Sequence, residues 1–403
     1  IPLHQEGYDG EDILVAVIDA GFQNVDGISG FDRLYDEGRL VYTENIVNPN
    51  VSVYSPSTSS HGTNVLSCMA AWLPGQFIGT APEASYALLV TEDSASEYPV
   101  ECYYWVVGAE VADSIGADII SSSLGYQAFD DSSLDFSHED MDGVTIASSI
   151  AATIATEKGI FVTVSAGNSN GTSSPWVTTP SDAIESCCVG AVDASGIIAY
   201  FSSIGPNGAG DPKPNILAMG SGTTVLSPSG SISTNSGTSF ACPVSAGMIS
   251  CLIQANPTLY PTELLQILNE VGDRYPNHSN TYGYGIPDYE EALEMVLERV
   301  DLQLDNYVIN EIEGNGDGLL NPGEIASVDV VVYNISENDI ENIEVQFSAI
   351  EDIYTLSSEG AVIPNLPAGG EYTLQNAFTI QLSEEAIPAT NAKIGVNMTH
   401  DNG

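Results

Sequence analysis

Continuous apolar runs that end in polar or glycine residues constrain the fold of this chain most strongly. Residues 13–18 read ILVAVI and lead directly into Asp19. A strand that is apolar on both faces is buried on both, which is typical of a parallel sheet covered by helices. Further apolar runs alternate with helix-like segments: strands at 87–91, 117–124, 159–164, 188–192, 198–202 and 215–218, and helices at 104–115, 144–156, 261–271 and 288–300. The alternation predicts an α/β fold with a doubly wound parallel sheet and right-handed crossovers.

Polar residues with catalytic potential lie at the ends of these runs. Asp19 follows the first run, where open α/β sheets place their ligands. His61 follows a polar Ser/Thr/Pro loop and begins a small-residue helix. Asn168 closes the run at 159–164, and its side-chain amide could donate to an oxyanion. Taken singly, each has a simpler explanation as a turn residue or a helix cap.

Residues 235–247, NSGTSFACPVSAG, form a serine-bearing turn that runs into a small-residue helix. Ser239 stands at the expected start of this helix, and Pro243 is expected in the first turn. Backbone N–H groups gather at a helix N-terminus and favour negative charge. This position suits a nucleophile whose transition state is an oxyanion, although a capping serine in a tight turn would look the same.

Four stretches in order, VAVIDAG, HGTNV, SAGN and GTSFACP, resemble the subtilisin-like serine proteases (subtilases) over about residues 10–295. The resemblance implies an endopeptidase in which Ser239 attacks the scissile carbonyl, His61 relays the proton and Asp19 orients the imidazole. It also implies an oxyanion hole and two substrate-binding walls for a protein or peptide. The implied oxyanion donors are Asn168 and the Ser239 backbone, and the walls are Ser123, Leu124 and Gly125 on one side and Ser165, Ala166 and Gly167 on the other.

The sequence departs from the family pattern at one position, and one alternative function stays open. Ala20 follows the catalytic Asp, where the family usually has Ser or Thr. An α/β-hydrolase is excluded because 237–241 is not G-x-S-x-G and the order of the triad differs. A non-catalytic surface- or polymer-binding protein on a subtilase scaffold remains open, although all three triad residues are present. The sequence marks no buried charge that would set a side-chain preference, and the family implies a precursor with an N-terminal pro-segment, which this chain does not contain.

The charge balance is extreme, with 55 acidic against 7 basic residues. Nucleic acid and anionic membranes are poor partners because almost nothing is present to neutralise phosphates. No apolar run reaches the roughly 20 residues that span a bilayer, so we expect no membrane insertion. So many carboxylates favour a secreted protein in a saline or calcium-containing setting. The six Cys fit a disulfide-permissive compartment without proving one, and their pairing stays open; a buried small hydrophobic role is the default for Cys242.

The last hundred residues change pattern. Alternating segments such as 326–333, 341–347 and 372–382 lie between Gly/Pro/Asn turns, which predicts an all-β sandwich. We therefore expect a catalytic domain at 1–300 and an accessory domain at 301–403. Such appended domains in secreted subtilases resemble modules for substrate or surface attachment.

A loop in this second region resembles a calcium-binding loop. Residues 313–324, EGNGDGLLNPGE, nearly fit D-x-[DN]-x-[DN]-G-x₅-E. The expected ligands for Ca²⁺ are side-chain oxygens of Glu313, Asn315, Asp317 and Glu324, the Leu319 carbonyl, and Asn321 directly or through water. A Gly/Asn-rich β-turn is the alternative. The acidic segment 130–142 likewise fits either a solvated loop or a cation site.

Overall fold

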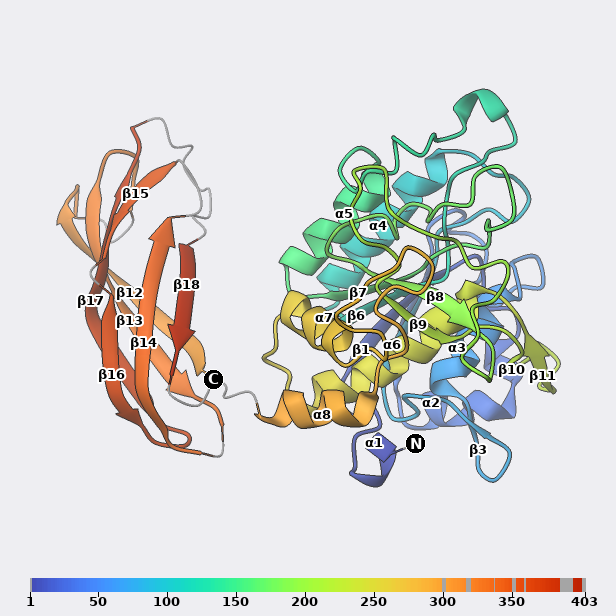
Figure 1. The fold of residues 1–403 in the computed structure, drawn as a ribbon, viewed down its shortest axis with the longest axis horizontal. Helices are drawn as coiled ribbons and strands as arrows, with labels where there is room; N and C mark the ends of the chain where they lie inside the picture. The colour runs from blue at the N-terminus through green and yellow to red at the C-terminus, as the bar shows by residue number, and fades with distance from the viewer. Residues whose placement is uncertain are drawn as a thin grey trace. The chain divides into compact units, whose positions relative to one another are not determined.

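A computed structural model describes most of the chain, which divides into two compact units that are treated separately (Figure 1). The units are Ile1–Val296 and Leu297–Gly403. The described residues are 2–298, 302–316, 320–336, 338–349, 353–358, 360–384 and 394–400.

The first unit is built on a seven-stranded sheet in which every neighbouring pair is parallel. The strand order is β2 (Leu40–Asn45), β5 (Ser85–Val90), β1 (Leu14–Asp19), β6 (Ile119–Ser122), β7 (Phe161–Ser165), β8 (Cys187–Val192) and β9 (Ile216–Met219). The predicted α/β class is confirmed. In this order, β1 lies between β5 and β6, so the carboxyl ends of these three strands are neighbours.

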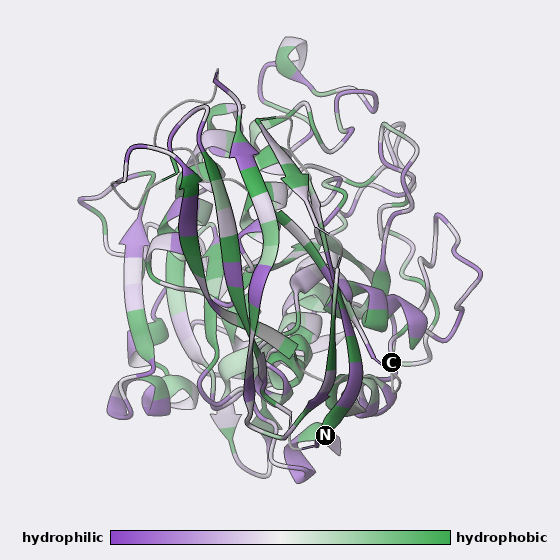
Figure 2. Cartoon of the chain, turned by 90° about the vertical axis from the view of Figure 1, so that its left-hand side faces the viewer, coloured by the Kyte–Doolittle hydropathy of each residue, from purple (hydrophilic) through white to green (hydrophobic). Residues whose placement is uncertain are grey.

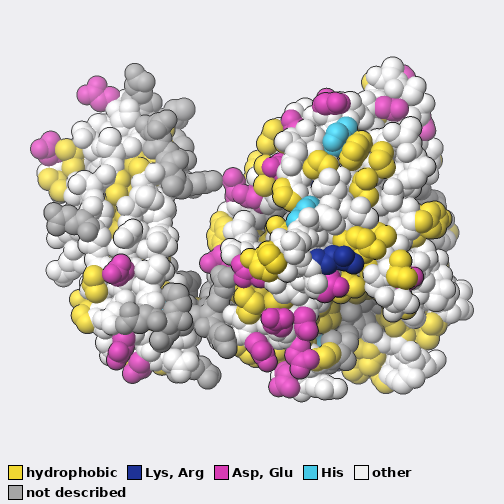
Figure 3. All heavy atoms as spheres, viewed as in Figure 1, with side chains coloured by type: hydrophobic (Ala, Val, Ile, Leu, Met, Phe, Trp, Pro, Cys, Tyr) yellow, Lys and Arg dark blue, Asp and Glu magenta, His cyan; other side chains and the backbone are white. Residues whose placement is uncertain are grey.

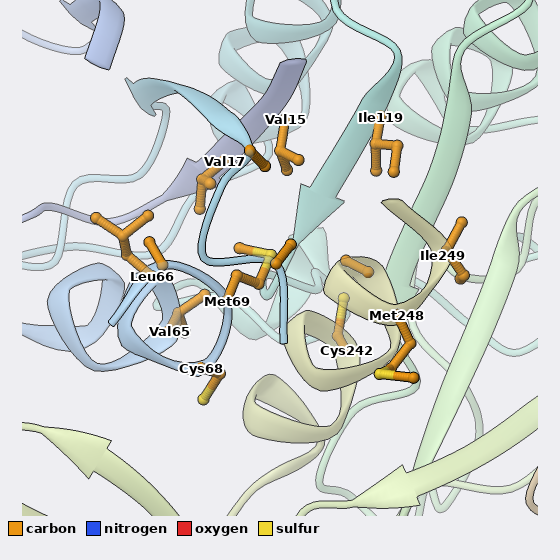
Figure 4. Packing of buried hydrophobic residues seen from close by; sticks show 14 of the residues in the cluster. Val15, Val17, Val65, Leu66, Cys68, Met69, Ile119, Cys242, Met248 and Ile249 are labelled. Carbon is orange, nitrogen blue, oxygen red and sulfur yellow. The ribbon is translucent and has the colours of Figure 1, made fainter. Parts of the chain in front are cut away.

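Helices cover both faces of the sheet, as a doubly wound fold requires. Alternate residues of β1 point to opposite sides: Val15 and Val17 join a cluster with α3 (His61–Ala70) and α6 (Thr238–Ala255), shown in Figure 4. On the other side, Ala16 and Ile18 pack with α4 (Val100–Ser114) and α5 (Ala147–Glu157). The continuous apolar run at 13–18 is explained by this two-sided burial.

Helix α6 begins one residue before Ser239 and carries Pro243 in its interior. The expectation that Pro243 occupies the first turn was wrong, because the helix starts early enough to place it one turn later. In the described part of the chain, α6 is also the one helix long and apolar enough to cross a membrane. It is 78% buried within the unit, as core helices are, so its composition is weak evidence for a span.

The remaining elements of this unit are shorter, and some differ from the predicted bounds. The segment 198–202 forms no strand, only an isolated antiparallel bridge from Ile198 to Val192. Helix α4 begins at Val100, four residues earlier than predicted. The other elements are α1 (Pro2–Gln5), α2 (Asp32–Asp36), β3 (Trp72–Leu73), β4 (Phe77–Ile78), β10 (Thr223–Leu226), β11 (Ile232–Asn235), α7 (Pro261–Glu270) and α8 (Tyr289–Glu298), with 3₁₀ turns at Val25–Gly27, Ser29–Phe31 and Ser132–Leu134.

The second unit consists of antiparallel strands in its described residues. One sheet has the order β12 (Leu302–Glu313), β13 (Ile325–Asn334), β17 (Glu371–Leu382) and β15 (Tyr354–Ser357), and the other β16 (Ala361–Leu366), β14 (Ile340–Ala349) and β18 (Ile394–Thr399). Hydrophobic and hydrophilic residues alternate along these strands in Figure 2. The apolar faces of both sheets share one buried cluster, which explains the period of two in the sequence.

All six cysteines are buried free thiols. Cys187 and Cys188 face opposite sides of β8, one in the large cluster and one beside Ala166 and Val177. Cys242 is fully buried in α6, in agreement with its expected role as a small apolar residue (Figure 4).

Candidate active site

The predicted site residues meet at the carboxyl edge of the parallel sheet. Asp19 ends β1, Ser123 follows β6 and Asn168 lies just beyond β7, while His61 begins α3 and Ser239 lies in the first turn of α6. All of these except Asp19 line a cavity of about 390 Å³. Of the predicted residues, the cavity is lined by His61, Ser123, Leu124, Gly125, Ser165, Gly167, Asn168 and Ser239. Asp19 lies beneath His61, and Ala166 does not line the cavity because it is buried against Val177 and Cys188.

The Asp19 carboxylate holds the His61 ring through Nδ1. Its two oxygens lie 2.9 and 3.0 Å from Nδ1, and Oδ1 also accepts a hydrogen bond of 2.7 Å from the Ala20 N–H. Asp19 is fully buried. The contact depends on Gly62, because a Cβ there would lie 2.5 Å from the Gly21 carbonyl oxygen. Since Nδ1 faces a carboxylate, it carries the proton, and Nε2 is left as the basic nitrogen.

The surroundings of His61 raise its pKa above the ordinary 6.5. Burial lowers it, but the charge and hydrogen bond of Asp19, with a smaller contribution from Glu92, outweigh the burial. A base must be neutral to accept a proton, so kcat/KM should rise with pH through a midpoint above 6.5. Initial rates on an uncharged peptide between about pH 5 and 9 measure this limb. A midpoint at or below 6.5 would contradict the Asp19 effect.

Ser239 lies at the mouth of the cavity with 8% of its surface exposed. Its Oγ donates a long hydrogen bond of 3.3 Å to the Ser123 carbonyl, and its own carbonyl accepts one of 2.8 Å from Ser123 Oγ. Ser239 and His61 line this cavity and also an adjoining hollow with Asn64 and Phe240. Because the hydrogen bond to the Ser123 carbonyl is long, Ser239 Oγ can give it up and donate to His61 instead. Hydrogen bonds between catalytic groups often form fully only when substrate is bound.

The Asn168 side chain is oriented by helix α6. Its Oδ1 accepts a hydrogen bond of 2.9 Å from the Thr238 N–H, which fixes the carbonyl end of the amide on the helix. The NH₂ end therefore turns to the cavity that Asn168 and Ser239 both line. An amide held this way can donate to a developing oxyanion without reorganising.

If Asn168 donates to the oxyanion, Asn168→Ala should lower kcat by a factor of about 10²–10³ with little change in KM, because such a donor acts only on the transition state. The loss of an oxyanion-hole donor in a well-studied serine protease supplies this magnitude. Steady-state kinetics on a peptide substrate give both parameters. Asn64→Ala, the same chemical change in the adjoining hollow, should cost less than about tenfold in kcat. Equal losses of kcat in the two variants would show that Asn168 is not the oxyanion donor.

Several residues that line the cavity were not predicted from the sequence, and two of them are acids. Glu92 and Glu97 line the same cavity as Ser239. Burial, followed by neighbouring carboxylates, raises the pKa of Glu92 to about 8 and that of Glu97 to about 7. Both side chains are half-buried acids that the sequence had not marked as candidates for setting a side-chain preference. Glu92 stands two residues past β5, so the rule that identified Asp19 would also have marked it.

The predicted calcium ligands are only partly brought together. Asp317 and Leu319 lie outside the described residues. Glu324 accepts backbone hydrogen bonds from Asn315 and Asn321 at 3.0 and 2.8 Å. Glu311, which was not predicted, accepts one of 3.0 Å from Gly316. Among the described residues, no group of three His, Cys, Asp or Glu side chains could hold a metal, so they do not by themselves fit a complete site.

The acidic segment 130–142 shows the same capping behaviour. Asp131, Asp135, Asp140 and Asp142 accept hydrogen bonds from nearby backbone N–H groups. The described residues include no metal-binding group here either. Turn capping by a solvated loop accounts for these acids.

Comparisons with known proteins agree with this geometry. Residues 10–285 match the model of the Subtilase family. Serine protease AprX of Bacillus subtilis is 31% identical over 70% of this chain and 66% of its own length, and Subtilisin NAT of Bacillus subtilis subsp. natto is 30% identical over 72% and 68%. The chain thus spans about two thirds of the length of these relatives.

Solved structures show the same fold at lower identity. The self-cleaved protease domain of PatA is 21% identical with a TM-score of 0.55, covering 72% of this chain and 98% of that one. MycP1 with its propeptide removed is 20% identical with a TM-score of 0.54, covering 72% and 94%. The family match and the relatives together establish that this chain belongs to the subtilase family of serine proteases.

Proposed function

We propose that this chain is a secreted serine endopeptidase that cleaves protein or peptide substrates through an Asp19–His61–Ser239 triad. The observation that carries the proposal is the buried Asp19 carboxylate 2.9 Å from His61 Nδ1, beside a cavity that His61 and Ser239 share. Membership of the family supports the reaction class, and the geometry supports the proposed assignment of the residues.

In the proposed reaction, Ser239 Oγ attacks the scissile carbonyl while its proton passes to His61 Nε2. The negative charge on the carbonyl oxygen is stabilised by Asn168 Nδ2 and the Ser239 backbone N–H. His61 then gives the proton to the leaving amine, and an acyl-enzyme remains. Water, activated by the same imidazole, hydrolyses the ester and restores Ser239.

Residues 123–125 on one side and Ser165 and Gly167 on the other line the cavity and are proposed to hold the extended substrate between them. We also propose a precursor whose N-terminal pro-segment occupies this cleft until it is cleaved. Both follow from the family resemblance.

Hydrolysis of casein tests the proposal against its alternative, a binding protein on a subtilase scaffold. The protease predicts acid-soluble peptides whose release stops with a serine-directed inhibitor. A folded chain that binds casein or a polymer surface without releasing peptides would favour the binding scaffold.

We propose further that Ca²⁺ binds the predicted loop 313–324 of the second unit, with the adjacent Glu311 as a further ligand, and supports the stability of that unit. The Glu311 and Glu324 carboxylates both approach Gly314: a Cβ there would lie 2.2 Å from Glu311 Oε1 and 3.1 Å from Glu324 Cδ. Two neighbouring carboxylates favour a hard cation. Bound calcium would neutralise them and hold the turn.

Removal of calcium should therefore lower the melting temperature of the full chain by several degrees, and Glu324→Gln should reduce this difference by more than half. Thermal unfolding with EDTA, with CaCl₂ and with added NaCl separates calcium binding from general screening of the net charge of −48. Glu371→Gln, on strand β17, is the matched control. Equal melting temperatures with EDTA and CaCl₂ would refute calcium support, and no effect of salt would count against a saline, extracellular setting.

A further inference from the structure

One side of the cavity beside Ser239 is acidic, and its acids indicate which kind of substrate side chain binds there. Glu92 and Glu97 line it together with Ser239 and Asn168. Both belong to the segment between β5, which ends at Val90, and α4, which begins at Val100. Because Glu92 and Glu97 line the same cavity as Ser239, a substrate group that contacts them lies beside the proposed nucleophile.

The two glutamates differ from two acids that pack against their segment, Glu101 and Asp130. Glu101 is buried and accepts backbone hydrogen bonds from Asp93 and Tyr98 at 2.9 and 3.0 Å, so it closes the loop. Asp130 accepts a hydrogen bond from the Glu97 N–H, and its own N–H donates to the Glu97 carbonyl. These contacts fix the backbone of the loop. They leave the carboxylates of Glu92 and Glu97 in the cavity, where neither has a hydrogen bond or ion pair within the described residues.

No Lys or Arg among the described residues pairs with these two carboxylates, and the nearby His61 only partly offsets the other effects that raise the pKa of Glu92. Each cation has another partner: Arg33 and Arg39 bind Glu37 and Glu83, Lys158 binds Asp113, Lys213 donates to Ser186, and Arg274 lies over Tyr282. On the face shown in Figure 3, Lys and Arg are confined to one small patch, while Asp and Glu are spread over the larger unit, with one cluster at its lower left. The described Lys and Arg side chains therefore leave these two carboxylates without an ion-pair partner, which a bound cationic group could supply.

A cationic group in the cavity would meet two half-buried carboxylates at once. Hydrogen bonds to ionised partners are stronger than neutral ones, and partial burial makes solvent screening less effective. A guanidinium presents several donors in a plane and can engage both acids, which a hydrophobic side chain cannot do. Without such a ligand, the charged forms of the two glutamates are disfavoured by burial and by neighbouring carboxylates, which raises the pKa of both.

We propose that Glu92 and Glu97 form a subsite for a basic side chain, arginine foremost, near the scissile bond of the substrate. This rests on the proposed function and adds its substrate class: peptides with a cationic residue bound in the cavity beside Ser239. The glutamates are specificity residues that contact substrate and take no part in proton transfer.

Matched peptides test the proposal. Quenched-fluorescence substrates carry either arginine or its uncharged isostere citrulline at each of the first four or so positions on the N-terminal side of the cleavage site. At one position, we expect kcat/KM for arginine to exceed that for citrulline by about 10- to 100-fold. In Glu92→Gln/Glu97→Gln, this ratio should fall to within about threefold of one, with the citrulline rate nearly unchanged. Glu110→Gln, an exposed change on α4, should keep the wild-type ratio.

Salt and pH distinguish a local subsite from the general negative field. At about 1 M NaCl, long-range attraction is screened, but the preference in the cavity should survive in large part. The arginine-to-citrulline ratio should rise from about pH 5.5 to 8.5 as both glutamates ionise, and stay flat in the double variant. Titration of His61 cancels in the ratio. The other groups facing the two glutamates are Asp19, Glu101, Cys102, Tyr126 and Asp130.

Binding to an inactivated chain makes the test independent of catalysis. Calorimetry with Ser239→Ala and the same peptides should show tighter binding of the arginine peptide, lost when both glutamates are also replaced. Equal rates and equal binding for arginine and citrulline at every position would overturn the subsite, as would a preference that the double variant retains. Hydrolysis without preference refutes only this inference, whereas preferential binding without hydrolysis by the wild type refutes only the proposed protease.

Discussion

Ser239→Ala should lower kcat on a peptide substrate by a factor of about 10⁶, the loss that removing the nucleophile causes in subtilisin, which supplies this magnitude. The proposed acyl-enzyme cannot form without Oγ, and the residual rate would come from the Asn168 donor and from binding alone. The substitution removes one hydrogen bond, of 3.3 Å to the Ser123 carbonyl. KM and the unfolding temperature should therefore change little.

The appropriate control for Ser239→Ala is Ser250→Ala. Ser250 lies in the same helix, is also buried, and its Oγ donates to the Ala246 carbonyl within the helix. It should keep kcat within about threefold of the wild type. If Ser239→Ala keeps more than about a hundredth of the wild-type kcat, the serine mechanism is wrong.

Asp19→Asn should lower kcat by about 10⁴, the loss measured for the equivalent change in a serine protease of unrelated fold. The local hydrogen bonds explain the size of the effect. Oδ1 accepts from the Ala20 N–H, so an asparagine would keep its carbonyl there and turn its NH₂ to His61 Nδ1. That nitrogen would then have to accept, the proton would move to Nε2, and Nε2 could no longer take a proton from Ser239.

Steady-state kinetics at a pH above the midpoint for His61 measure this loss of kcat, because the imidazole is then neutral in the wild type. Asp118→Asn is the control, because Asp118 Oδ2 accepts from the Leu14 N–H at the opposite end of the same strand, β1. It should leave kcat within about threefold. An Asp19→Asn chain within about tenfold of the wild type would show that the tautomer of His61 is not controlled by Asp19.

Local sequence was enough to predict the parallel sheet and the arrangement of the strand-end residues. The run at 13–18 is apolar because β1 is covered on both faces, and that burial places Asp19 at the carboxyl edge. His61 begins a helix as its small-residue context indicated. These features depend on a few neighbouring residues and on the period of the pattern.

Other features depend on contacts between distant segments, which no local pattern records. Glu92 and Glu97 become cavity residues only because Glu101 and Asp130 close their loop. The segment 198–202 is apolar like a strand but forms only an isolated bridge. Ala166 belongs to a motif of the binding wall, yet its side chain packs inward. In each case, tertiary packing decided the outcome.

The most direct test of the proposed mechanism is to locate the residue modified by a fluorophosphonate probe. Such probes react only with a serine activated by a neighbouring base. The full chain is labelled near pH 8, digested and mapped by tandem mass spectrometry. We expect a single adduct on Ser239, absent from His61→Ala although that variant remains folded. An adduct on another serine, or none in a folded sample, would contradict the Asp19–His61–Ser239 mechanism.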